Sequence, residues 1–132
     1  MRKGSLKRIR IAIGRIFLAV NLLFITTLSL VPVKGALAVN IWDKAQHTGA
    51  YLLLGLLAAS ANRSFCLTPH TATYLALYGV LIEVIQGCLP WRSFSLLDMV
   101  ANAFGISLAA LITIAFVKRK PRLINSADTN DQ

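Results

Sequence analysis

The chain has 132 residues, 56% of them hydrophobic, and a mean hydropathy of +0.65. Soluble domains are usually about 45–50% apolar, so this composition argues against an ordinary soluble domain and favours a polytopic membrane protein. The net charge of +9 could suggest nucleic-acid binding, but ten of the 14 Lys and Arg form two terminal clusters beside apolar blocks. That is the arrangement of the positive-inside rule, and we therefore expect no nucleic-acid partner.

Four long apolar blocks follow one another along the chain, at residues 16–33, 41–61, 71–89 and 96–117. Each is long enough to span a bilayer, and helices satisfy their own backbone hydrogen bonds there. A basic lead (residues 1–15) precedes them, and a basic, then polar, tail (residues 118–132) follows, which we expect to be disordered after Pro121. The sequence predicts an all-α, four-helix transmembrane bundle over residues 16–117.

The basic clusters also predict the orientation of this bundle. Both termini are expected to be cytoplasmic, together with the loop that carries Arg63. Trp42 and Trp91 then fall at the outer interface, where indole rings prefer to lie. An alternative is that the first block is a cleaved signal peptide, because a basic start, an apolar run and residues 36–38 imitate its three regions.

Polar residues interrupt the apolar blocks near their predicted outer ends. His47 lies five residues after Trp42, Glu83 lies seven before Pro90, and Asp98 lies eight after Pro90. At about 1.5 Å per residue, these side chains lie within roughly 10 Å of the outer surface. Three helices therefore bring polar groups to one level of the bilayer.

The spacing of these residues places each polar set on one helix face. Members recur at intervals of three or four positions, and small residues accompany them, which permits close helix packing. We therefore expect the polar stripes to face one another and not the lipid. The stripes are Asp43, His47 and Tyr51, then Gly79, Glu83 and Gln86, and then Asp98, Asn102, Gly105 and Ala109.

Polar residues inside membrane helices have two interpretations. They can simply bond helices together, for about 0.6 kcal/mol each. Three carboxylates, a histidine and two cations are more than such a role needs, because a mid-helix Asp costs about 2.5–3.5 kcal/mol to insert. A functional site is the favoured hypothesis.

The same residues resemble the VanZ-like family of small integral membrane proteins, named for a factor linked to teicoplanin resistance. The similarity covers residues 42–110, and it is weaker in its first half, where Thr48 replaces a usual aromatic residue. It implies a bacterial cytoplasmic membrane protein that acts on or binds an anionic lipid head group or a lipid-linked envelope precursor. The matching residues are Asp43, Lys44, His47, Tyr51, Leu54, Gly55, Glu83, Gln86, Pro90, Arg92, Ser95, Asp98, Ala101, Asn102 and Gly105.

Residue chemistry suggests roles within such a site. His47 and Glu83 are the candidate acid–base pair, because imidazole titrates near neutral pH and a buried carboxyl can exchange a proton. Asp98 could orient His47 or, with Asp43 and Glu83, bind a divalent cation, although the spacing matches no familiar zinc motif. Arg92 is the candidate anion-binding residue, or it pairs with Asp98.

The remaining polar residues are expected to support substrate binding. Lys44 could assist Arg92 or extend toward the head groups, while Gln86, Asn102 and Tyr51 could hold the reacting groups in place. Ser95 fits a helix N-cap better than a nucleophile. Two alternatives stay open: a non-catalytic protein that alters envelope access for glycopeptide-type antibiotics or scaffolds partners, and a small transporter.

Overall fold

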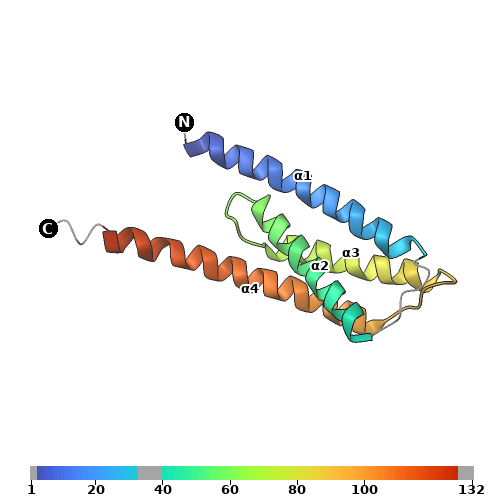
Figure 1. The fold of residues 1–132 in the computed structure, drawn as a ribbon. Coiled ribbons are helices and arrows are strands. Elements are labelled where there is room, and N and C mark those ends of the chain that lie inside the picture. Colours follow the sequence, from blue (N-terminus) through green and yellow to red (C-terminus); the bar gives the residue numbers. More distant parts are fainter. Residues whose placement is uncertain (1–2, 33–39, 128–132) are drawn as a thin grey trace.

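The computed structural model describes residues 3–32 and 40–127, and this part contains four helices (Figure 1). The all-α prediction is confirmed, because each predicted apolar block forms a helix. The helices are α1 (Lys3–Leu30), α2 (Asn40–Ser60), α3 (Pro69–Gly87) and α4 (Leu96–Ala127).

Two helices extend beyond the apolar blocks that predicted them. α1 begins at Lys3, within the basic lead, and α4 continues to Ala127. α4 therefore continues beyond the apolar block that ends at residue 117, and as far as Ala127 it includes residues after Pro121 for which we expected disorder. Hydropathy marks the apolar part of a helix and not its end, and Lys and Arg are good helix formers. The rest of the tail, and the connection with the signal-peptide-like residues 36–38, lie outside the described residues.

The helices alternate in direction, so that α1 begins and α4 ends at the same end of the bundle (Figure 1). α2 packs most extensively against α4, and small residues allow this close approach. A Cβ atom at Gly105 would overlap the Thr48 carbonyl oxygen and lie 2.9 Å from Leu52 N, while one at Gly55 would overlap Ala109. The predicted small-residue packing is thus confirmed for this pair.

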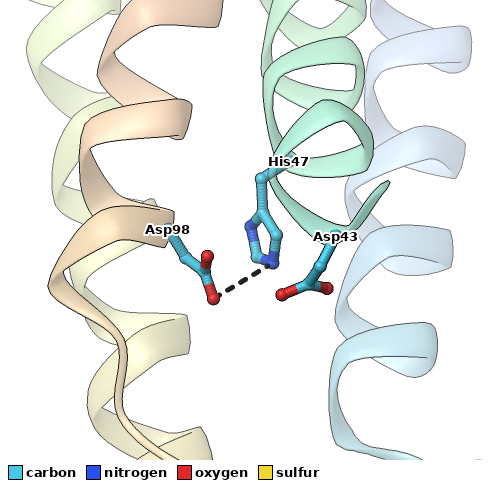
Figure 2. A group of neighbouring side chains, drawn as sticks. All are labelled: Asp43, His47 and Asp98. Atoms are coloured by element: carbon cyan, nitrogen blue, oxygen red, sulfur yellow. Dashed lines mark ion pairs between the residues drawn. The ribbon is translucent and has the colours of Figure 1, made fainter. Parts of the chain in front are cut away.

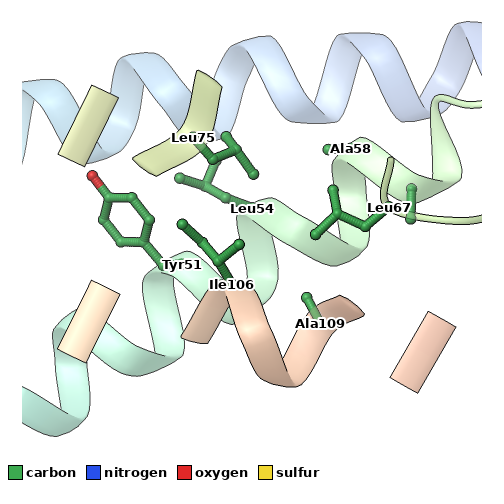
Figure 3. Packing of buried hydrophobic residues seen from close by; sticks show 8 residues of the cluster. Tyr51, Leu54, Ala58, Leu67, Leu75, Ile106 and Ala109 are labelled. Carbon is green, nitrogen blue, oxygen red and sulfur yellow. The ribbon is translucent and has the colours of Figure 1, made fainter. Parts of the chain in front are cut away.

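A small apolar core lies where α2, α3 and α4 meet (Figure 3). Leu54, near the middle of α2, is fully buried, and Leu75 and Ile106 reach it from the two neighbouring helices. The outer surface is also apolar, since Phe17, Leu77 and Phe104 are more than half exposed. Exposed apolar surface on this scale is rare on soluble monomers and typical of a membrane environment.

Two described helices are long and apolar enough to cross a membrane. They are Gly4–Leu30 in α1 and Leu96–Arg119 in α4, in which a window of 18 residues has a mean hydropathy of 2.0 and 2.2, respectively. α2 and α3 do not meet the same limits of length and composition, and they carry many of the polar residues identified above. Length and composition therefore favour membrane association.

Candidate functional site

The start of α2, the end of α3 and the start of α4 meet at one end of the bundle. This arrangement brings the predicted polar residues together from three helices, as their spacing predicted. Glu83, Asp98 and Asn102 are polar, yet they are buried between the helices and no more than 6% exposed. We call Asp43, Lys44, His47, Glu83, Ser95, Asp98 and Asn102 the polar cluster.

Asp98 is the most connected residue of the polar cluster. One of its carboxylate oxygens accepts a hydrogen bond from the Lys44 ammonium, and the other lies 3.8 Å from His47 Nε2. Lys44 also lies 3.6 Å from the Asp43 carboxylate. The ammonium group therefore bridges two carboxylates that would otherwise repel each other.

His47 is held from both sides of its ring. Its Nδ1 lies 3.0 Å from Asn102 Oδ1, and because an amide oxygen only accepts, Nδ1 must carry the proton in this bond. Nε2 then faces the carboxylates of Asp43 and Asp98 (Figure 2). In neutral His47, Nε2 is the nitrogen free to accept a proton or bind a cation.

Glu83 enters the polar cluster through the connection between α3 and α4. Its Oε2 accepts a hydrogen bond from Ser95 N at 3.2 Å, whereas its fully buried Oε1 has no hydrogen-bond partner within the described residues. Ser95 Oγ accepts from Asp98 N at 3.3 Å, which confirms the predicted N-cap. Lys44 Nζ lies 3.4 Å from the same hydroxyl. Ser95 thus links Glu83 to the pair of Lys44 and Asp98.

Tyr51 lies one helical turn deeper than His47 and is 2% exposed. A Cβ atom placed on Gly79 would lie 3.0 Å from the Tyr51 hydroxyl and 3.1 Å from Asn102 Nδ2. The missing side chain at Gly79 therefore leaves room for both polar groups beneath His47. The Tyr51 hydroxyl has no hydrogen-bond partner among the described residues.

Two predicted site residues lie apart from this network. Gln86 Nε2 donates to the Ser29 carbonyl oxygen at 3.0 Å, so its amide holds the end of α1 against α3. Arg92 is exposed and lies in the connection between α3 and α4. Asp98 pairs instead with Lys44 and His47, and no ion pair of Arg92 occurs among the described residues.

Asp43, His47 and Asp98 could hold a cation. One ligand atom from each lies within 4.8 Å of the other two (Figure 2). Two carboxylates and an imidazole suit a divalent metal ion, but the Lys44 ammonium already contacts Asp98 and would have to move. The present arrangement is therefore a charge network, and Glu83 does not belong to the three-residue group.

Two cavities of the described structure lie at the opposite end of the bundle. One lies between α1, the end of α2 and the start of α3, and the other lies between α1 and α2. Neither is lined by a residue of the polar cluster. The pocket predicted to open outward from the cluster has no support from these cavities and stays a prediction.

The sequence did not predict the contribution of α1 to this end of the bundle. Besides Gln86, Tyr78 contacts α1, at 2.8 Å from Thr26 Oγ1, and Trp91 Nε1 donates to the Leu30 carbonyl oxygen at 3.4 Å. Two of these contacts use backbone carbonyl oxygens, which have no side-chain signature. A Tyr and a Gln on the α3 side of the interface are the only hints in the sequence.

No protein family model matches the sequence, and no solved structure matches it. The chain is similar to an uncharacterized protein of Schizosaccharomyces pombe, with 37% identity over 91 residues, covering 64% of this chain and 54% of that protein. The chain therefore spans about half the length of the curated relative it matches. Because this relative comes from a yeast and has no described activity, it does not support the expected bacterial membrane, which stays a prediction.

Proposed function

We propose that the chain is an integral membrane protein with four spanning helices and cytoplasmic termini. The support is the apolar exposed surface, the alternating helix directions and the basic residues where α1 begins and α4 continues. α2 and α3 would cross the membrane with their polar faces buried in the bundle. The VanZ-like resemblance supports the same placement and suggests a bacterial cytoplasmic membrane.

The polar cluster would then lie at head-group depth in the outer leaflet. We infer that it binds or acts on an anionic lipid head group or a lipid-linked envelope precursor. The observation that carries this proposal is Glu83, a fully buried carboxyl group beside a histidine network, one oxygen of which has no hydrogen-bond partner in the described part of the chain. A buried polar atom without a hydrogen bond lowers the stability of the fold. Proton transfer by the carboxyl group would explain why the site contains one.

Each residue has a task in this mechanism. The exposed Arg92 would receive the phosphate, because its planar guanidinium group matches phosphate oxygens. His47 Nε2 would accept a proton from water or a lipid hydroxyl while Asn102 holds Nδ1. As the oxygen of that water or hydroxyl bonds to phosphorus, Asp98 would stabilise the resulting imidazolium ion. Glu83, in its protonated form, would give its proton to the oxygen whose bond to phosphorus breaks.

The second candidate is a non-catalytic protein that alters envelope access or scaffolds a partner. One observation favours it: Lys44, Asp98, His47 and Asn102 already pair with one another. A network satisfied in this way can hold three helices together without any reaction. The candidates differ in whether the protons of Glu83 and His47 matter.

Lipid mass spectrometry of cells with and without the protein tests both candidates. An acid–base enzyme changes the lipid profile, and Glu83→Gln or His47→Ala abolishes the change, while the exposed control Ser107→Ala does not. A binder retains a co-purifying lipid in Glu83→Gln but loses it in Arg92→Ala. If Glu83→Ala, His47→Ala and Arg92→Ala all insert normally and preserve every lipid effect, the proposal fails.

Cysteine labelling tests the orientation separately. With Cys66 and Cys88 replaced by Ser, a cysteine at the exposed Ser93 should react with an impermeant reagent in intact cells. One at the exposed Ser64 should react only after permeabilisation. The reverse pattern would place the polar cluster on the cytoplasmic side.

A further inference from the structure

The larger cavity lies at the end of the bundle opposite the polar cluster and has a volume of about 710 Å³. It opens between α1, the end of α2, the loop that follows α2 and the first turn of α3. This volume is typical of cavities that bind small molecules. Its lining residues on these elements include Arg8, Ile11, Arg15, Leu18, Ala58 and Arg63.

Three arginines give this cavity a strong positive charge. Arg8, Arg15 and Arg63 are exposed, and none has an acidic partner among the described residues. The acidic residues of that part of the chain are Asp43, Glu83 and Asp98. Asp43 precedes Ala61 by 18 residues of nearly continuous helix, which separates the two ends by about 27 Å. No described carboxylate can therefore neutralise the cavity.

The remaining wall of the cavity is mostly apolar. Ile11 and Leu18 lie two helical turns apart on α1, and Ala58 faces them from α2. A free phosphate ion would use the arginines and gain nothing from this wall. A molecule with an anionic head and a hydrocarbon chain matches both parts.

The loop beside the cavity is held in place from two directions. Arg10 Nη2 donates to the Asn62 carbonyl oxygen at 2.9 Å, and its guanidinium carbon lies 5.2 Å from the Phe65 ring centroid. Leu67 N donates to Thr113 Oγ1 at 3.3 Å, which ties the loop to α4. These contacts position Arg63 before any ligand binds, which lowers the entropic cost of binding.

We propose that this cavity binds one anionic phospholipid of the cytoplasmic leaflet. Its phosphate lies among Arg8, Arg15 and Arg63, and one acyl chain lies along Ile11 and Leu18. The leaflet assignment rests on the membrane placement proposed above, whereas the binding itself does not depend on the chemistry of the polar cluster.

Native mass spectrometry of the full chain in detergent tests the proposal, with dioleoyl-phosphatidylglycerol as probe and dioleoyl-phosphatidylcholine as comparison. We expect one phosphatidylglycerol to bind, with about tenfold preference over phosphatidylcholine, since each nearby arginine favours an anionic lipid. The variant with Arg8→Gln, Arg15→Gln and Arg63→Gln should lose this preference. The matched control with Lys7→Gln, Lys118→Gln and Arg119→Gln removes the same charge outside the cavity and should keep it.

A steric variant tests the location without changing any charge. Ala12 is exposed and lines the cavity, so Ala12→Trp should fill the space and weaken phosphatidylglycerol binding while leaving thermal unfolding unchanged. Arg92→Ala should remove any lipid held at the polar cluster but leave phosphatidylglycerol binding in this cavity as in the wild type, which separates this proposal from the function of the polar cluster.

Four results would overturn the inference. The first is an equal loss of the phosphatidylglycerol preference in the arginine variant and in its matched control, and the second is equal binding of both lipids by the wild type. The third is undiminished phosphatidylglycerol binding by Ala12→Trp. The fourth is displacement of the lipid by inorganic phosphate at a similar concentration. The last would identify a soluble anion as the ligand. If the arginine variant fails to fold, Ala12→Trp decides.

Discussion

Replacing Lys44 by Met tests whether the polar cluster is held together by charge. Met is unbranched and matches the aliphatic part of the Lys side chain in length, so the substitution removes only the ammonium group that Asp98 and Asp43 share. Removing one partner of a buried ion pair costs about 3–5 kcal/mol. The Lys44 side chain is 27% exposed, so water compensates for the lost charge in part, and we expect the free energy of unfolding to fall by about 2 kcal/mol.

Unfolding by sodium dodecyl sulfate in mixed micelles, followed by circular dichroism, measures this loss. Asp98→Asn introduced into Lys44→Met should restore part of the stability, because the uncompensated carboxylate is gone, and the coupling energy should be about 1–2 kcal/mol. Lys118→Met is the matched control on an exposed face and should change stability by less than about 0.5 kcal/mol. Equal effects of the two Met variants, or additive effects of Lys44→Met and Asp98→Asn, would refute the reasoning.

Two further predictions concern the helices that carry the cluster. Gly105→Ala should lower the free energy of unfolding by about 2 kcal/mol, because the new Cβ overlaps backbone atoms of α2. The control Gly49→Ala has open space around it and should be neutral or slightly stabilising in the same titration. If Gly105→Ala were as stable as the wild type, the close approach of α4 to α2 would be contradicted. Ser95→Ala should lower the free energy of unfolding by about 1 kcal/mol, because it removes the N-cap of α4. Ser107→Ala, at an exposed mid-helix position, should lower it by less than about 0.5 kcal/mol. Equal losses in the two variants would argue against the N-cap.

Much of the polar cluster could be predicted from the sequence, because the sequence gives both the spacing of polar residues along each helix and their distance from the predicted helix end. Residues four apart share a helix face, and distance from Pro90 or Trp42 gives the level in the membrane. These two rules brought His47, Asp98 and Asn102 together correctly. These rules could not assign partners. The alternative role for Arg92, pairing with Asp98, is filled by Lys44, because side-chain reach and rotamer decide between neighbouring cations.

The contributions of α1 were beyond sequence reasoning for a different reason. Apart from the contact between the Thr26 and Tyr78 hydroxyls, the contacts of α1 described above use the backbone carbonyls of Ser29 and Leu30, while Arg10 donates to the carbonyl oxygens of Asn62 and Arg63. Every residue has a carbonyl, so no residue type marks these positions. The same limit applies to Glu83, whose hydrogen bond comes from a backbone N–H group.

The two ends of the bundle use charge in opposite ways. At the polar cluster, the cations and carboxylates come from facing helices and neutralise one another, which stabilises the approach of α2 to α4. At the α2–α3 loop, Arg8, Arg15 and Arg63 have no such acidic partners among the described residues, so their repulsion opposes the approach of α1 to the loop. An anionic ligand would relieve that repulsion. If the lipid proposal is correct, binding of phosphatidylglycerol should therefore stabilise the packing of α1 against α2 and leave the α2–α4 contact unchanged.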